Sequence, residues 1–188
     1  RVEMGQLSEY VAKITPEGAN MARLIREAVV SYPTVICQNF VDIIDTPGLD
    51  DDAEMTRITI NMIEHADAVI VPISARSPFS ETEKRFVCDL LERENIGSLI
   101  FVVTFIDQLD EDDYTYDSFM HFVKNRILND VFVELEKRSC SSQVQQKAHR
   151  MLDGIEVHGI SSVLALESFL TNDSKKREKS HFEAFYRY

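Results

Sequence analysis

The sequence has few cysteines and no long hydrophobic run. Its three cysteines, Cys37, Cys88 and Cys140, are odd in number, and none lies in the Cys-x-x-Cys spacing of zinc and redox sites. We therefore expect free thiols rather than a disulfide framework or a zinc site, and a reducing, cytoplasmic environment. The longest apolar runs, residues 68–73 and 99–103, are far shorter than the roughly 20 residues that a membrane-spanning helix needs.

Basic residues are scarce as well. The chain has 20 Lys and Arg against 32 Asp and Glu, a formal net charge of −12 and a pI near 4.8. Such an acidic surface repels the phosphate backbone of nucleic acids, so we expect no nucleic-acid partner. With 188 residues, of which 44% are hydrophobic, the chain is long and apolar enough to bury the core of one domain.

Apolar runs and helical patterns alternate along the chain. The runs typical of strands are residues 28–37, 40–44, 68–73, 99–104 and 155–160. Apolar residues recur at helical spacing in residues 54–64, 81–93, 116–138 and 162–170, and the polar segment 143–152 is also predicted to be helical. A capping box of Ser80 and Glu83 precedes the second helix, and Val163, Leu166 and Phe169 are predicted to face inward in the last. Strands that are apolar throughout are typical of buried parallel sheets, so we predict an α/β fold: a mostly parallel sheet flanked by helices on both faces.

In such sheets the ligand binds at the carboxyl ends of the strands, and Asp45-Thr46-Pro47-Gly48-Leu49 follows one apolar run. An Asp at the end of a buried strand can hold Mg²⁺ through water, and a Gly lets its N–H reach a terminal phosphate oxygen. We therefore predict Asp45 as the metal residue and Asp45, Thr46 and Gly48 as nucleotide-binding residues. The alternative is an ordinary strand-ending turn capped by Asp45.

A second polar cluster, Thr104-Phe105-Ile106-Asp107, follows the run at 99–103. A fixed carboxylate at Asp107 can accept hydrogen bonds from N1–H and the 2-amino group of guanine, a donor pair that adenine lacks. Thr104 can brace the loop through its hydroxyl group. The alternative is that Asp107 caps the next segment.

A third cluster, Ser161 and Ser162, follows the run at 155–160. Backbone N–H groups on a turn here can meet O6 of guanine. The alternative is that Ser162 is the N-cap of the helix that follows.

These segments, in this order, resemble the motifs of guanine-nucleotide-binding proteins. Residues 45–48 match the DxxG element of switch II, residues 104–107 resemble the base-specificity element [N/T]KxD, and residues 159–162 resemble the loop behind the base. The fullest resemblance is to the dynamin-like GTPases, particularly bacterial ones. It is carried by residues 41–49, 66–74, 78–83, 162–166 and 181–185. It implies a P-loop-NTPase-like sheet, GTP or GDP with Mg²⁺ as cofactors, and Gly48 as the catalytic γ-phosphate contact on this chain.

The sequence departs from that family at several points. It contains no GxxxxGK[ST] segment, which in the family precedes the strand ending at Asp45 and cradles the phosphates. We therefore expect residues 1–188 to be a single G domain that is incomplete at its amino end and inactive alone, with 171–188 leading to a following helical region. Phe105 stands where the family has Lys, which leaves guanine specificity open. Leu49 offers no side-chain amide to orient water.

The resemblance implies GTP hydrolysis, self-association through the G domain, and membrane remodelling by regions outside this chain. The expected location is the cytoplasm, and the protein is also expected to bind peripherally to a membrane. Two alternatives stay open. Residues 79–83 and the threonine-containing base motif also resemble septin and immunity-associated GTPases. The second alternative is a degenerate, non-hydrolysing G domain that has lost the phosphate loop and acts as an interaction module.

Overall fold

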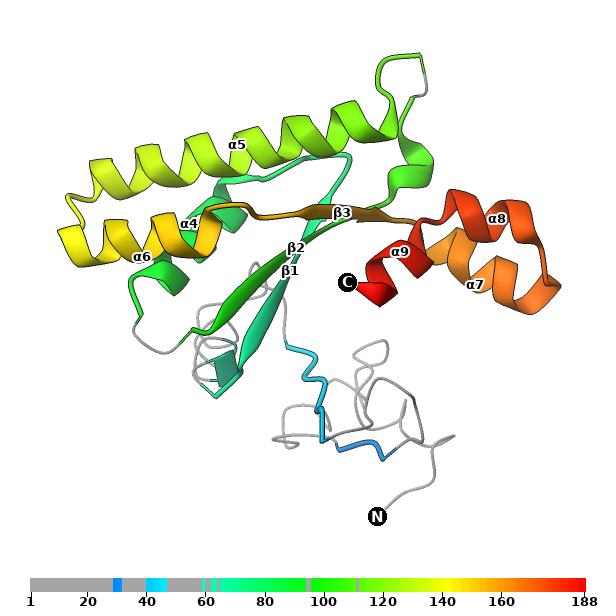
Figure 1. Cartoon of the computed structure of the whole chain (residues 1–188), viewed down its shortest axis with the longest axis horizontal. Helices are drawn as coiled ribbons and strands as arrows, with labels where there is room; N and C mark the ends of the chain where they lie inside the picture. Colours follow the sequence, from blue (N-terminus) through cyan, green and yellow to red (C-terminus); the bar gives the residue numbers. More distant parts are fainter. Residues whose placement is uncertain are drawn as a thin grey trace, which may run out of the picture. The chain divides into compact units, whose positions relative to one another are not determined.

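The computed structural model describes residues 29–31, 40–46, 59, 62–63, 65–93, 96–110 and 112–188. The chain divides into two compact units, Arg1–Asp45 and Thr46–Tyr188. The strands and helices named below all lie in the second unit, which holds the predicted base-binding segments (Figure 1).

The second unit is built on a parallel sheet with the strand order β1-β2-β3. The strands are β1 (Ala68–Ser74), β2 (Ser98–Thr104) and β3 (Val157–Ile160). The helices are α4 (Glu81–Leu91), α5 (Tyr116–Lys137), α6 (Ser142–Leu152), α7 (Ser162–Thr171), α8 (Ser174–Lys179) and α9 (Phe182–Arg187). Because α4 connects β1 to β2, and α5 and α6 connect β2 to β3, the predicted α/β fold is confirmed.

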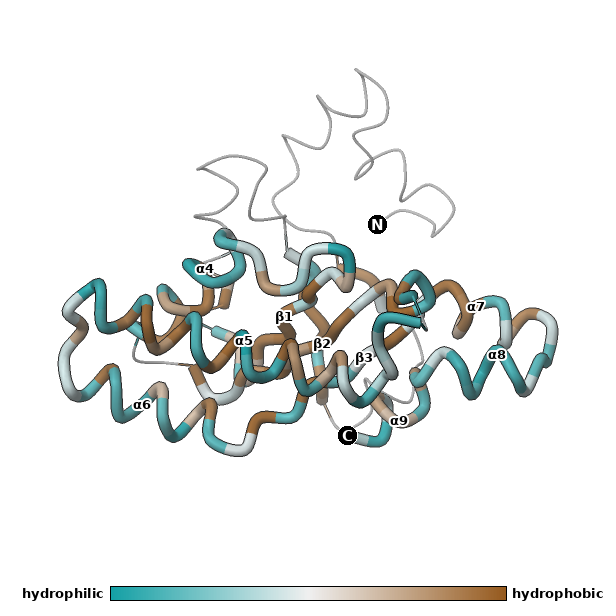
Figure 2. The backbone as a smooth tube through the Cα atoms, turned by 90° about the horizontal axis from the view of Figure 1, so that it is seen from above, coloured by the Kyte–Doolittle hydropathy of each residue, from teal (hydrophilic) through white to brown (hydrophobic). Residues whose placement is uncertain are grey.

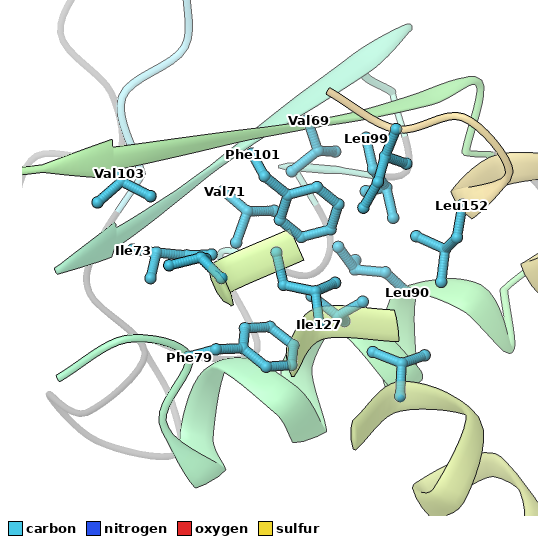
Figure 3. Packing of buried hydrophobic residues seen from close by; sticks show 14 of the residues in the cluster. Val69, Val71, Ile73, Phe79, Leu90, Leu99, Phe101, Val103, Ile127 and Leu152 are labelled. Atoms are coloured by element: carbon cyan, nitrogen blue, oxygen red, sulfur yellow. The ribbon is translucent and has the colours of Figure 1, made fainter. Parts of the chain in front are cut away.

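Alternate residues of the strands form the core on one face of the sheet. The buried side chains are Val69, Val71, Ile73, Leu99, Phe101 and Val103, and Figure 3 shows them gathered with Leu90, Ile127 and Leu152. Helix α5 contributes Val123, Ile127, Val131 and Leu135, whose spacing of four residues keeps them on one face. Each such side chain contributes about 1.5–3 kcal/mol by leaving water, which anchors the strand ends discussed below.

The opposite face of the sheet is covered unevenly. Near β3, His158 contacts the rings of Phe185 and Tyr188 at centroid distances of 6.0 and 4.3 Å, so α9 and the carboxyl terminus pack on this face. On β1, however, buried and exposed residues alternate, and Ile70 is 54% exposed. The prediction that the apolar strands are buried on both faces is therefore wrong for β1. An apolar strand sequence shows that both faces of the strand can be buried, but it does not show which helix or loop covers each face.

Local signals placed most helix ends correctly. The predicted capping box is present, with the Glu83 N–H donating to Ser80 Oγ at 3.4 Å and the Ser80 N–H donating to Glu83 Oε2 at 2.5 Å. Of the helix predicted at 54–64, the structure describes Thr59, Met62 and Ile63, which are helical. Cys88 and Cys140 are free thiols, as expected, while Cys37 lies outside the described residues.

Two further predictions are corrected by the structure. The strand predicted at 40–44 is not formed, because these residues join no ladder, and a strand exists only through pairing with a neighbour. Helix α7 does not turn its predicted face inward: Val163, Leu166 and Phe169 are exposed, Phe169 by 81%. The helix lies beyond the end of β3 and packs on the largely hydrophilic α8, which leaves its hydrophobic positions without cover (Figures 1 and 2).

Candidate functional site

The carboxyl ends of the described strands meet in one row. Thr104, the last residue of β2, pairs with Ser74 at the end of β1 and with Ile160 at the end of β3. Its carbonyl accepts the Ala75 N–H at 3.0 Å, and its hydroxyl donates to the Ile73 carbonyl at 3.3 Å. Thr104 therefore braces β1 and β2, and the loops that begin after the three strands leave from the same edge of the sheet.

The loop after β2 presents Asp107 to solvent. Phe105 has a left-handed backbone (φ 62°), after which Ile106–Gln108 form a 3-10 helix, η2. Ile106 is buried and anchors this turn, whereas Asp107 is exposed. Among the described residues, no hydrogen bond or ion pair engages the Asp107 carboxylate, so both of its oxygens are available as acceptors for a ligand.

A cation from the loop after β1 lies beside Phe105. The Arg76 guanidinium carbon is 5.3 Å from the centre of the Phe105 ring, and its Nε donates to Oε1 of Gln108. The ring itself is 43% exposed. Arg76 thus places a positive charge next to Phe105, the position at which the guanine-nucleotide-binding motif has Lys. Sequence reasoning missed Arg76, because the two loops meet only in the folded chain.

After β3, the polar groups of Ser161 make hydrogen bonds within the protein, whereas the N–H of Ser162 stays available to a ligand. Ser161 is fully buried; its hydroxyl accepts the Leu164 N–H at 3.2 Å, and its own N–H donates to the Ser180 carbonyl at 3.0 Å. The N-cap of α7 is therefore Ser161, and the alternative assignment of Ser162 is wrong by one residue. Ser162 is exposed and begins the helix, where an N–H has no intrahelical acceptor, so this N–H remains available as a donor to a ligand.

Tyr116, the first residue of α5, reaches the same strand end. Its hydroxyl accepts the Gly159 N–H at 3.0 Å and donates to the Gly159 carbonyl at 3.4 Å. Burial raises the pKa of this phenol, which keeps the proton in place for donation. The sequence carried no signal for this contact, since a Tyr at the start of an amphipathic helix is equally typical of packing alone.

The predicted phosphate and metal residues are placed only in part. Asp45 is the last residue of the first unit and is exposed, Thr46 begins the second unit and is half-buried, and Gly48 lies outside the described residues. The structure therefore brings Thr104, Asp107, Ser161 and Ser162 to one edge and leaves the roles of Asp45, Thr46 and Gly48 as predictions. Within the described ranges, no group of three or more His, Cys, Asp or Glu residues forms a cluster suited to a metal ion.

The family of the chain follows from comparison with known proteins. A model of the dynamin family matches residues 2–106, which is more than half of the chain. The chain belongs to the dynamin family. The predicted resemblance to a dynamin-like G domain is thereby confirmed. The matched range includes Asp45, Gly48 and Thr104 and ends at Ile106, one residue before Asp107.

Two curated relatives are similar over parts of the chain. An uncharacterized protein in the xynA 3′ region of Caldicellulosiruptor sp. (strain Rt8B.4) is 25% identical over 157 residues, which cover 83% of this chain and 33% of that protein. A bacterial dynamin-like protein of Nostoc punctiforme (strain ATCC 29133 / PCC 73102) is 26% identical over 84 residues, 45% of this chain and 12% of that protein. The chain thus spans a third or less of the length of these relatives. Among the helices described, none is both long and apolar enough to cross a membrane.

Proposed function

We propose that this dynamin-family protein binds guanine nucleotide with Mg²⁺ and hydrolyses GTP to GDP and phosphate. The observation that carries the proposal is the edge where β2 and β3 end. There the exposed Asp107 carboxylate of η2 and the N–H of Ser162, the first residue of α7, follow the ends of neighbouring strands, and neither is engaged by another described residue. An acceptor and a donor on adjacent loops fit the edge of guanine, which presents two N–H groups beside O6.

Each residue of this edge has a distinct part in base binding. The Asp107 carboxylate accepts N1–H and the 2-amino group, and the N–H of Ser162 donates to O6. Thr104 holds the end of β2 against β1, as its hydrogen bonds to Ile73 and Ala75 support. The exposed Phe105 ring, with Arg76 beside it, offers a surface for the flat base in place of the usual Lys stem.

We assign binding of the nucleotide's phosphates to the DxxG motif at residues 45–48. Asp45 would hold Mg²⁺ through water, and the Gly48 N–H would contact the γ-phosphate. When bound, Mg²⁺ neutralises charge on the β- and γ-phosphates. In hydrolysis, water attacks the γ-phosphorus, the bond to the bridging oxygen breaks, and that oxygen leaves on GDP. No GxxxxGK[ST] sequence is present in residues 1–188, so we expect these residues alone to bind nucleotide very weakly.

Base recognition is tested with the product of the complete reading frame and a fluorescent nucleotide. Asp107→Asn replaces one acceptor with a donor, so affinity for GDP should fall at least tenfold while affinity for xanthosine diphosphate, which carries a 2-oxo group, rises. Asp113→Asn is the matched control, because it removes the same charge from an exposed residue six positions later. Equal affinity of the wild type and Asp107→Asn for GDP would refute the assignment.

A second candidate function is a non-hydrolysing G domain that serves as an interaction module; residues 1–188 contain no GxxxxGK[ST] segment, which is compatible with it. The two functions are separated by phosphate release from GTP under saturating nucleotide. Turnover by the wild type that Asp45→Ala abolishes supports the enzyme, whereas tight binding of GDP without turnover supports the module. A wild type that binds no guanine nucleotide at all argues against both.

We infer further that the protein is cytoplasmic, self-associates when it binds nucleotide, and remodels membranes through regions outside residues 1–188. Support comes from family membership and from the relative named a bacterial dynamin-like protein. Sedimentation with and without a non-hydrolysable GTP analogue tests self-association, and electron microscopy of anionic liposomes tests remodelling. A protein that stays monomeric in the analogue and leaves the liposomes unchanged would contradict both inferences.

A further inference from the structure

Tyr116 holds the backbone of β3 just before the loop that carries Ser162. Its hydroxyl bonds both the N–H and the carbonyl of Gly159, at 3.0 and 3.4 Å. The N–H and C=O of one strand residue point to the same side, and β3 lies at the edge of the described sheet. The Tyr116 side chain thus makes the hydrogen bonds that the backbone of a further strand would make, and it fixes the position of the carboxyl end of β3.

The same glycine is where η2 meets α5. A β-carbon built on Gly159 would lie 2.9 Å from each of three atoms, Ile106 Cγ2, Met120 Cε and Tyr116 Cε2. Ile106 immediately precedes Asp107. Tyr116 and Ile106 therefore both pack against Gly159. The position of β3 relative to η2 depends on how closely these two side chains approach that glycine.

A further contact holds the loop from the carboxyl-terminal side. The His181 ring stacks on the Tyr116 ring at a centroid distance of 3.8 Å and an interplanar angle of 3°. The residue before it, Ser180, accepts the N–H of Ser161 at 3.0 Å through its carbonyl. Tyr116 thus holds Gly159, and the segment joining α8 to α9, which stacks on Tyr116 through His181, holds the N–H of Ser161 two residues later.

We propose that Tyr116 is the positioning residue of the guanine pocket: through Gly159 it sets the separation between the Asp107 carboxylate and the Ser162 N–H. The inference rests on the proposed function. The two N–H groups and O6 of guanine are fixed on one rigid ring, so acceptor and donor must be held at a matching spacing for all three hydrogen bonds to form. Tyr116 acts through Gly159 and does not contact the base.

The test uses Tyr116→Phe in the product of the complete reading frame. The variant keeps the ring that stacks on His181 and removes only the hydroxyl group. GDP affinity is compared with the affinity for inosine diphosphate, which keeps N1–H and O6 but lacks the 2-amino group. We expect about threefold to tenfold weaker GDP binding, the effect of about one hydrogen bond, together with a smaller preference for GDP over inosine diphosphate.

Tyr114→Phe is the matched control. It removes the same hydroxyl group two residues earlier, from a ring that packs on Phe119 at 5.3 Å and on Phe122 at 6.1 Å. Both the GDP affinity and the preference over inosine diphosphate should stay at their wild-type values. A role of Tyr116 in stability alone would lower the unfolding midpoint of Tyr116→Phe and leave its nucleotide preference unchanged.

Amide hydrogen exchange without nucleotide gives a readout that does not depend on binding. The Gly159 amide should exchange faster in Tyr116→Phe and at the wild-type rate in Tyr114→Phe. If the wild type discriminates between the nucleotides and Tyr116→Phe does so equally well, the positioning role is refuted while the proposed function stands. If the wild type binds no guanine nucleotide, the proposed function fails and the positioning role fails with it.

Discussion

Ile106 of η2 fills the space beside Gly159 of β3 so closely that a β-carbon on the glycine would lie 2.9 Å from Ile106 Cγ2. Ile106 precedes Asp107, and Gly159 lies two residues before Ser161. The contact therefore joins the two loops assigned to base recognition, which are far apart in the sequence. A change on either side is expected to affect both stability and nucleotide preference.

Gly159→Ala should lower the free energy of unfolding by about 1–3 kcal/mol, because the added methyl group overpacks a site already occupied by Ile106, Met120 and Tyr116. Urea unfolding followed by circular dichroism measures this loss. Gly154→Ala is the control: it has no atom within 4 Å of the added carbon, and only its positive φ of 71° opposes the change. A preference for GDP over inosine diphosphate that falls in Gly159→Ala alone would link the packing to the pocket.

Arg138 joins the end of α5 to α4 and should matter more than an ordinary surface cation. Its Nη1 lies 2.6 Å from Asp89 Oδ1 and 2.8 Å from Glu92 Oε1, and its Nε lies 3.1 Å from Glu134 Oε1. Arg138→Met should cost about 1–2 kcal/mol of unfolding free energy, with a smaller loss in 1 M NaCl because salt screens these partly exposed pairs.

Arg126→Met is the matched control for that change. Arg126 makes an exposed pair with Asp130 at 3.5 Å within α5, so its loss should stay within about 0.5 kcal/mol. Equal losses for the two variants would show that the Arg138 network contributes no more than a single surface pair.

Cys88 should make stability depend on pH in the alkaline range. Burial raises the pKa of its thiol from 9.0 to about 12. Above pH 9 the unfolded chain loses this proton while the folded chain keeps it, so the contribution to stability is full below pH 9 and is lost as pH rises toward 12, by about 1.4 kcal/mol for each pH unit. Unfolding measured from pH 8 to 10.5 should show this slope in the wild type, and a slope that persists in Cys88→Ala would assign it to other groups.

Phe169→Glu should leave stability within about 0.5 kcal/mol of the wild type, because the Phe169 side chain on α7 is 81% exposed. Phe119→Ala is the contrast: that residue is 4% exposed in the core, and its truncation should cost about 3–5 kcal/mol. Thermal unfolding compares the two. A loss above about 2 kcal/mol in Phe169→Glu would mean that the hydrophobic face of α7 is buried after all.

Several features of this protein are determined by its sequence through short-range physics. The Ser80 and Glu83 capping box starts α4 because both partners lie within one turn, and the apolar spacing of α5 selects the buried face from Val123 to Leu135. The parallel order of the strands follows from their alternation with helices. Since parallel strands end at one edge, that alternation was also enough to bring Thr104 and the loop at Ser161 together.

Other features were decided only by the tertiary structure, because they depend on which surfaces meet. Periodicity marks the hydrophobic stripe of α7 but not the partner that covers it, and the helix packs on α8 with Phe169 exposed. Arg76 meets Phe105, and Tyr116 bonds Gly159 across 43 positions, through strand register and helix placement that no local pattern encodes. The sequence by itself predicted which residues are candidates for the chemistry of a G domain. Only the tertiary structure placed Ile106, Met120 and Tyr116 around Gly159, because distance is a property of contacts between elements and not of spacing along the chain.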